Sequence, residues 1–311
     1  MLVHINPTSH PTQSSIAQLV ERLTVNQFVP GSSPGGGALI GFNALGYLGR
    51  LGNQMFQYAA LKGIARNRGF NYCVPPTISE KDWSSVEEYY QAMNNGKVGH
   101  LLFQPFNMTN NTQLNFQYID KDRSVIEESG FDFDQSLLDE CPDWVDLRGF
   151  FQSEKWFKNI EDEIRQDFTF KDEILEPCKE MIKDISNPVS LHIRRKDYLT
   201  NSNHCTVGLD YYTSALELVG KNSNVLVFSD EPDWCNEQEL FKDDRFMIAE
   251  GNTGYIDMCL MSLCSEHIIA NSSFSWWGAW LANSDQVIAP SNWFPDGKEV
   301  KDLYCEGWKV I

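Results

Sequence analysis

The chain has 311 residues, of which 42% are hydrophobic, and a formal net charge of -18 at pH 7. This length allows one large or two medium domains with a substantial core. Because Asp and Glu outnumber Lys and Arg by 43 to 25, the surface should repel nucleic acid and anionic membranes, which excludes both as expected partners. No apolar run approaches the roughly 18 residues of a membrane span, and no secretory signal pattern opens the chain. We therefore expect a cytoplasmic protein.

The eight cysteines are scattered along the chain without a CxxC pair. This pattern disfavours zinc and is typical of reduced, mostly buried thiols. We accordingly expect no metal held by cysteines.

Residues 15–38, "SIAQLVERLTVNQFVPGSSPGGGA", differ in character from everything downstream. Reverse translation of "AQLVE", "LTVNQ" and "GSSP" gives the usual D-arm, an anticodon arm and the usual T-arm of a transfer RNA gene. Our hypothesis is that residues 1–38 are a non-native or disordered leader read from such a gene. A native peptide covering residues 20–34, detected by mass spectrometry, would contradict it. The alternative is a flexible leader with one short helix at residues 16–23.

From about residue 38 the chain alternates short apolar runs with helical periods, which predicts an α/β fold. "ALIGFN" (38–43) reads as a strand, a glycine-rich turn follows, and "NQMFQYAALKGIARN" (53–67) has apolar residues at helical spacing. The segment 79–145 is acidic and aromatic with weak periodicity, so no order of elements can be assigned there.

The last third contains five apolar runs separated by predicted helices near 210–219, 254–264 and 274–282. This alternation is the signature of a doubly wound parallel sheet, in which ligands bind at the carboxyl ends of the strands. Three polar clusters should meet there: His192 to Asp197, Ser229 with Asp230, and Asn271 to Ser273. The predicted lobes are residues 39–187, expected on the acceptor side, and residues 188–311, expected to bind the nucleotide sugar.

Arg194 and Arg195 follow the first of these strands, where paired guanidinium groups can chelate a leaving diphosphate without a metal. The alternative is a solvated basic turn that pairs with nearby acids. Asp197 could act as a general base or could orient an arginine. His192 is expected to be mainly structural, with help to the diphosphate as its second role.

Asn271, Ser272 and Ser273 precede a predicted helix, so their hydroxyls and the free backbone amides could form a second anion cradle. The alternative is a simple N-cap. Trp276 and Trp277, like the third tryptophan of this helix, should be mostly core, although one could face a sugar ring.

"GRLGNQMFQYA" (49–59) puts glycines before a helix but has neither GxGxxG nor GK[ST], so it supports neither a dinucleotide fold nor a P-loop kinase. Asn53 and Gln54 could bind a hydroxyl-rich ligand, or could belong to a turn and a cap. "DFD" (132–134) has the spacing of a sugar-nucleotide metal site, but its setting is that of an acidic exposed loop, so we do not expect a metal there.

Five segments together resemble successive blocks of the α-1,2-fucosyltransferase family, from about residue 41 to the end of the chain. They are "GRLGNQMFQYAAL", "GFFQSEKWF", "SLHIRRKDYL", "VFSDEPDWC" and "NSSFSWWGAWL". The resemblance implies a GT-B-like fold with two Rossmann-like lobes facing a cleft. It also implies an inverting, metal-independent enzyme that needs no cofactor and moves L-fucose from GDP-β-L-fucose to the 2-hydroxyl of a terminal β-galactoside on a glycan acceptor.

By motif position, Arg194 and Arg195 would hold the diphosphate, with support from His192 and Asp197. Asp230 would lie near the nucleoside. Ser272 and Ser273 would contact phosphate, and Asn271 would belong to the same donor-binding set. Asn53, as a catalytic residue, and Gln54, as a donor-binding residue, would face the cleft from the other lobe. Two other functions stay open: a transferase of the same fold with another nucleotide sugar or linkage, and a carbohydrate-binding protein without turnover.

Overall fold

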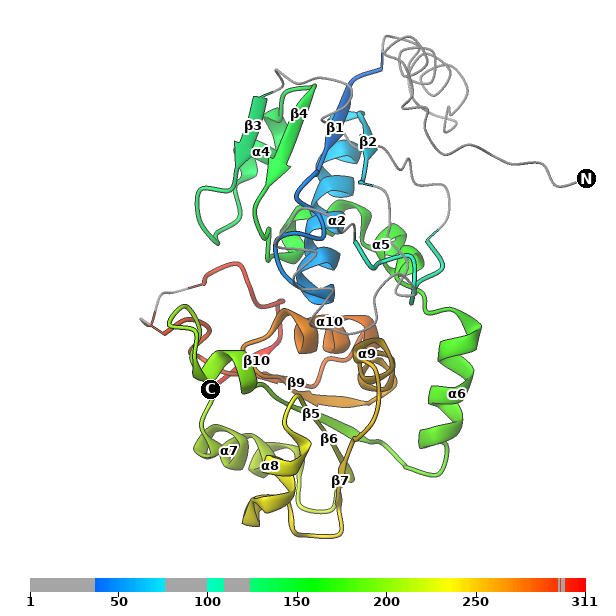
Figure 1. Ribbon diagram of the computed structural model, residues 1–311, viewed down its shortest axis with the longest axis vertical. Helices are drawn as coiled ribbons and strands as arrows, with labels where there is room; N and C mark the ends of the chain where they lie inside the picture. The colour runs from blue at the N-terminus through cyan, green and yellow to red at the C-terminus, as the bar shows by residue number, and fades with distance from the viewer. Residues whose placement is uncertain (1–36, 76–99, 109–123, 296, 298–299) are drawn as a thin grey trace, which may run out of the picture.

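The computed structural model describes residues 37–75, 100–108, 124–295, 297 and 300–311. Almost all of the expected leader, and much of the segment 79–145, lie outside these residues. The described chain forms two α/β lobes stacked one on the other (Figure 1).

The first lobe is built on a four-stranded parallel sheet in the order β2-β1-β4-β3. Its elements are β1 (Leu39–Gly41), α2 (Leu51–Arg68), β2 (Asn71–Cys73), β3 (Ser124–Glu127), α4 (Gln135–Glu140) and β4 (Val145–Arg148). Helix α2 ends at Gly69, whose φ of 70° lets its N–H reach the carbonyls of Ala65 and Arg66. The strand expected at 38–43 and the helix expected at 53–67 are thus confirmed.

Four short helices lead from the first lobe to the second: η3 (Glu154–Trp156), η4 (Lys158–Ile160), α5 (Glu161–Asp167) and α6 (Asp172–Ile182). The expected boundary near residue 187 falls between α6 and the first strand of the second lobe. Helix α6 nevertheless packs on the second lobe, since Cys178 Sγ lies 3.9 Å from the carbonyl oxygen of Ile256.

The second lobe has a six-stranded parallel sheet in the order β10-β9-β8-β5-β6-β7. Its elements are β5 (Val189–Ile193), η5 (Lys196–Leu199), α7 (Leu209–Val219), β6 (Val225–Ser229), α8 (Pro232–Glu237), η6 (Glu239–Phe241), β7 (Phe246–Ile248), α9 (Gly254–Ser262), β8 (Glu266–Ile268), α10 (Ser273–Ala282), β9 (Val287–Ala289) and β10 (Lys309–Val310).

In chain order these six strands follow the 3-2-1-4-5-6 arrangement of a doubly wound Rossmann sheet. Helices α9 and α10 cover the face toward the first lobe, and α7 and α8 cover the other face (Figure 1). All five residues of β5 are buried, as a central parallel strand requires. The expected α/β fold with two Rossmann-like lobes is confirmed.

The two lobes share one aromatic core where α2 meets α10. The ring of Phe56 lies 4.5 Å from Trp276 and 4.9 Å from Trp277, and Phe157 stacks on Trp277 at 5.5 Å between centroids. Trp276, Trp277 and Trp280 are all buried, so the expected core role of these tryptophans is confirmed.

The first turns of α2 and α10 touch through their backbones. A Cβ atom on Gly52 would lie 2.6 Å from the carbonyl carbon of Ser273 and 2.7 Å from the amide nitrogen of Phe274. Only a residue without a side chain fits so close an approach. Among the helices that the structure describes, none is long and apolar enough to span a membrane.

Candidate active site

The site lies where the strand order of the second sheet reverses, between β5 and β8. In doubly wound sheets the crevice at this switch point, outside the carboxyl ends of the strands, is where ligands bind. The basic run starting at Arg194 follows β5, and the polar run ending at Ser273 follows β8. The topology therefore brings the two strongest sequence candidates to the same edge.

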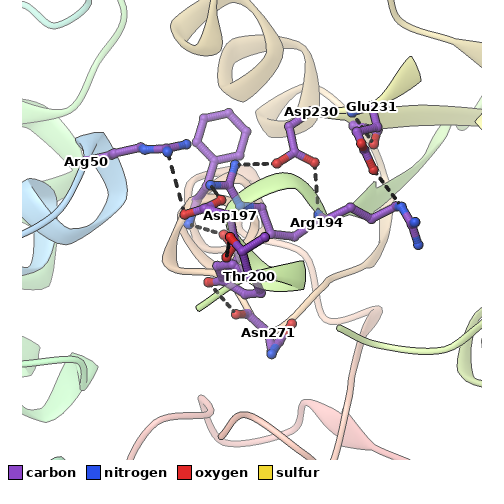
Figure 2. Close-up of polar contacts among 12 residues, drawn as sticks. Arg50, Arg194, Asp197, Thr200, Asp230, Glu231 and Asn271 are labelled. Atoms are coloured by element: carbon purple, nitrogen blue, oxygen red, sulfur yellow. Dashed lines mark hydrogen bonds and ion pairs between the residues drawn. The ribbon is translucent and has the colours of Figure 1, made fainter. Parts of the chain in front are cut away.

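Arg194 is held by two carboxylates (Figure 2). Its Nη1 lies 3.0 Å from Asp230 Oδ2, and its Nη2 forms an ion pair with Asp197 Oδ1. The other oxygen of Asp197 lies 3.6 Å from Nη2 of Arg50, which caps α2 in the first lobe. Because both oxygens of Asp197 face arginines, the geometry supports its orienting role over that of a general base.

Arg195 points its side chain toward α8. Its Nε donates to Glu231 Oε2 at 2.7 Å, and its guanidinium lies 3.8 Å from the ring centre of Trp234. Its backbone N–H donates to Asp230 Oδ1 at 2.9 Å. Asp230 thus ties the two arginines together and fixes the turn after β5.

The arginines of this centre are matched by carboxylates. Three arginines face three acids: Arg50, Arg194, Arg195, Asp197, Asp230 and Glu231. A guanidinium has five N–H donors in a plane, so carboxylates can orient it and leave other donors for a phosphate. The arginines therefore pair with nearby acids, as one of the two alternatives predicted. The turn that carries them nevertheless lies at the switch point, where an anion can bind.

In the run Asn271 to Ser273, the first two side chains are buried and structural, and the third is partly exposed. Ser272 Oγ accepts the N–H of Phe274 at 3.4 Å, which is an N-cap bond. The Nδ2 of buried Asn271 donates to the carbonyl oxygens of Cys205 at 2.8 Å and Trp293 at 3.1 Å, so this amide joins two loops. Ser273 is only partly buried and begins α10, which leaves it the best placed of the three to meet an anion.

His192 is buried on β5, with its ring 5.5 Å from that of Phe274. Burial first, and the charge of Arg194 second, lower its pKa from 6.5 to about 3. Its Nδ1 has no hydrogen-bond partner among the described residues. The ring is thus neutral at physiological pH, consistent with a mainly structural role.

The low pKa of His192 should make stability fall on acidification. Below pH 6.5 the unfolded chain takes up a proton that the native ring refuses until about pH 3, so the unfolded state gains in that window. We expect His192→Gln to make the fall in unfolding free energy between pH 6 and 4 shallower by about 1.4 kcal/mol per pH unit. Urea unfolding at several pH values measures it. Identical slopes for the two proteins would contradict the expectation.

Asn53 and Gln54 lie in the first turn of α2. The Gln54 amide is fully buried, with Nε2 donating to Gly49 O at 3.4 Å and Oε1 accepting the N–H of Leu101 at 2.9 Å. These contacts give Gln54 a structural role inside the first lobe. Asn53 Oδ1 accepts from Gln152 Nε2 at 2.8 Å and stays partly exposed, next to the contact between α2 and α10.

Sequence reasoning did not single out Arg50, Glu231 or Asp257. Arg50 and Glu231 lie inside the quoted blocks "GRLGNQMFQYAAL" and "VFSDEPDWC". A charged residue beside a turn in such a block could have been recognised as a candidate site residue. Asp257 lies in the first turn of α9, accepts from Asn252 Nδ2 at 2.9 Å, and burial raises its pKa to about 6. The sequence around Asp257 does not predict that its carboxyl group is buried.

The "DFD" segment has a structural explanation. Asp134 caps α4, and its Oδ1 accepts the backbone N–H groups of Ser136 at 2.9 Å and Leu137 at 3.2 Å. Within the described ranges, no group of three or more His, Cys, Asp or Glu side chains is arranged to hold a metal ion.

A doubly wound lobe with arginines and a helix N-terminus at its switch point is typical of nucleotide-binding enzymes. The model of the protein family described as "Glycosyl transferase family 11" matches residues 18–311 of the chain. The chain belongs to this family, which confirms the fucosyltransferase-type resemblance. The match begins inside the segment that we expect to be a leader.

Curated relatives carry related names. The chain is 42% identical over 164 residues to an alpha-1,2-colitosyltransferase of Escherichia coli, an alignment that covers 48% of this chain and 56% of that protein. It is 28% identical to the O-antigen biosynthesis glycosyltransferase WbnK of Escherichia coli, over 84% of this chain and 97% of that one. It is 23% identical to galactoside alpha-(1,2)-fucosyltransferase 1 of Alouatta caraya, over 81% and 69%.

Solved structures similar to the chain include a mutant of Arabidopsis thaliana FUT1 in complex with GDP. That likeness has a TM-score of 0.49 and 10% identity, and it covers 92% of this chain and 77% of that one. POFUT1 in complex with GDP gives a TM-score of 0.48 at 14% identity, over 81% and 96%.

Proposed function

We propose that the protein transfers L-fucose from GDP-β-L-fucose to the 2-hydroxyl of a terminal β-galactoside, with inversion and without a metal. The observation that carries the proposal is Arg194, fixed by Asp197 and Asp230 at the switch point of a family 11 chain. The names of the relatives support an α-1,2 linkage.

In the proposed reaction the acceptor oxygen attacks the anomeric carbon on the face opposite GDP. The bond from that carbon to the diphosphate oxygen breaks, and GDP leaves with both bonding electrons. Negative charge therefore grows on the diphosphate as an oxocarbenium-like sugar forms. Fixed N–H donors of Arg194 and of the first turn of α10 stabilise that charge, because they are oriented before the reaction begins.

Asp197 acts in this scheme as a positioning residue. It holds Arg194 of the second lobe and Arg50 of the first with its two oxygens. An ion pair that joins the lobes at the diphosphate couples their arrangement to donor binding. The acceptor hydroxyl gives up its proton to water as the new C–O bond forms. Asp197 is not assigned as the base, since both of its oxygens face cations.

A colitosyl donor is the second candidate, favoured by the relative that is named an alpha-1,2-colitosyltransferase. The residues at the switch point serve either donor, since they address the diphosphate and not the sugar. A comparison of the GDP-linked fucosyl and colitosyl donors under equal conditions decides between them.

The full chain incubated in EDTA with GDP-fucose and lactose should release GDP and form a fucosylated product, both followed by mass spectrometry. Lactose offers a terminal β-galactoside, and EDTA tests the metal-free part. Activity that appears only after a divalent cation is added would contradict that part. GDP release without product would keep the donor and reject this acceptor. A folded protein that releases no GDP from either donor would favour a carbohydrate-binding protein.

A further inference from the structure

A pocket of about 200 Å³ lies at the carboxyl ends of β9 and β10. Two segments wall it, residues 205–208 before α7 and residues 290–295 after β9, and Ile311 after β10 completes the lining. Tyr211 also lines it, and its hydroxyl hydrogen-bonds to the carbonyl oxygens of Ile269 at 2.8 Å and Ile288 at 3.0 Å, just past β8 and in β9. The pocket is therefore built on the sheet itself.

The same pocket adjoins the run Asn271 to Ser273, where an anion cradle is expected. Asn271, the residue before Ser272, holds one wall through Cys205 O and the other through Trp293 O. A single side chain thus fixes both walls relative to the start of α10. A group bound here would lie on the β9 side of the cradle, whereas Asp230 and Glu231 lie on the β6 side.

The pocket also lies beside the junction of the lobes. Phe294, which lines it, has its ring 4.4 Å from Phe131 in the loop between β3 and α4 of the first lobe. The same two parts of the chain meet again farther along, where Asp302 Oδ2 accepts the N–H of Phe133 at 3.0 Å. The segment after β9 reaches up to the first lobe in Figure 1. An acceptor lying between the lobes would meet this wall.

The described side chains that line the pocket are uncharged and amphipathic, and the lining also includes Ile311, the last residue of the chain. The lining offers the hydroxyls of Thr206 and Ser291, the amide of Asn292 and the ring of Phe294. A pyranose has hydroxyls around its edge and C–H groups on its faces, which hydroxyl, amide and aromatic groups can match. An anionic sugar would lose hydration there without a cationic side chain of the described lining to pair with.

We propose that this pocket is the acceptor subsite and binds a neutral pyranose of the glycan. The inference rests on the proposed function for its reaction, while the pocket itself is a binding site that can be tested without turnover. It assigns acceptor choice to the loops at 205–208 and 290–295 of the second lobe.

Gly208 allows a clean test. It lines the pocket, its φ is an ordinary -75°, and a Cβ placed there meets nothing within 4 Å. Gly208→Phe should fill the pocket and raise the KM for lactose by about tenfold or more, with the KM for GDP-fucose within about twofold of the parent. Ser214→Phe adds the same ring to an exposed position of α7 and is the matched control.

Asn292→Ala is a second variant that only removes an exposed amide, so its folding is not in question, and it should raise the lactose KM severalfold. An unchanged lactose KM in Gly208→Phe would overturn the proposal. If Gly208→Phe instead raised the KM for GDP-fucose and left the KM for lactose unchanged, the proposal would also be overturned, since the pocket would then hold the nucleotide sugar.

Direct binding separates this proposal from the proposed function. Saturation-transfer NMR with methyl β-galactoside should show binding to the parent and to Ser214→Phe, and none to Gly208→Phe. That pattern in a protein inactive with GDP-fucose would support the subsite and reject the donor. Equal signals from all three proteins would overturn the subsite even in an active enzyme.

Discussion

Arg194→Ala should lower kcat by roughly 30- to 1,000-fold, which corresponds to a loss of about 2 to 4 kcal/mol of transition-state stabilisation. Its side chain is largely buried, with 14% exposed, and is held by Asp197 and Asp230, so its N–H donors are oriented before charge develops on the diphosphate. Removing it also deprives Asp197 and Asp230 of the cation that they share beside the proposed phosphate site, although Arg50 still faces Asp197. Steady-state kinetics with GDP-fucose and lactose measure the effect.

The neighbouring Lys196 supplies the control, since it belongs to the same basic run but is exposed. Lys196→Ala should change kcat by less than about threefold, because an exposed charge is screened by water. A loss of less than tenfold in Arg194→Ala would refute a central role for this arginine. Equal losses in both variants would point to the overall charge of the run and not to a fixed donor.

Gly52→Ala should lower the free energy of unfolding by about 1 to 3 kcal/mol, the usual cost of overpacking. In a helix this substitution ordinarily stabilises a protein. Here the added methyl would lie 2.6 Å from the carbonyl carbon of Ser273, and backbone cannot give way cheaply. Activity should fall as well, because the relief of this clash moves the first turn of α10.

Gly254→Ala is the matched control at the start of α9. Its Cβ would meet only the Phe274 ring at 3.7 Å, which is an ordinary contact. Urea unfolding should therefore show opposite signs, with Gly254→Ala neutral or stabilising by up to about 1 kcal/mol. Equal changes in unfolding free energy for the two variants would contradict the expectation, because they would show that α2 and α10 can move apart here at little cost.

Strong periodicity made much of the fold predictable. The five apolar runs of the second lobe became β5 to β9, since a buried parallel strand needs a continuous apolar stretch that is visible in sequence. The two residues of β10 and the six of α8 are too short to show a period. They form because neighbouring elements already provide the sheet edge and the packing surface.

The site was predictable in its location but not in its contacts. Arginines at a strand end indicate an anion site, yet their partners come from other elements: Asp230 follows β6, and Arg50 caps a helix of the other lobe. Asn271 and Gln54 show the same limit. A polar side chain beside a turn serves a ligand or a distant carbonyl equally well, and only tertiary structure decides.

The aromatic seam formed by Phe56, Phe157, Trp276 and Trp277 bears on how substrates enter. Two lobes joined by a polar, wet interface can rotate as rigid bodies, whereas an apolar interface resists opening because it would expose its rings to water. Wide hinge motion about this seam is therefore costly. Substrate exchange should instead depend on small movements of loops such as 205–208 and 290–295, which leave the packing of α2 on α10 intact during each catalytic cycle.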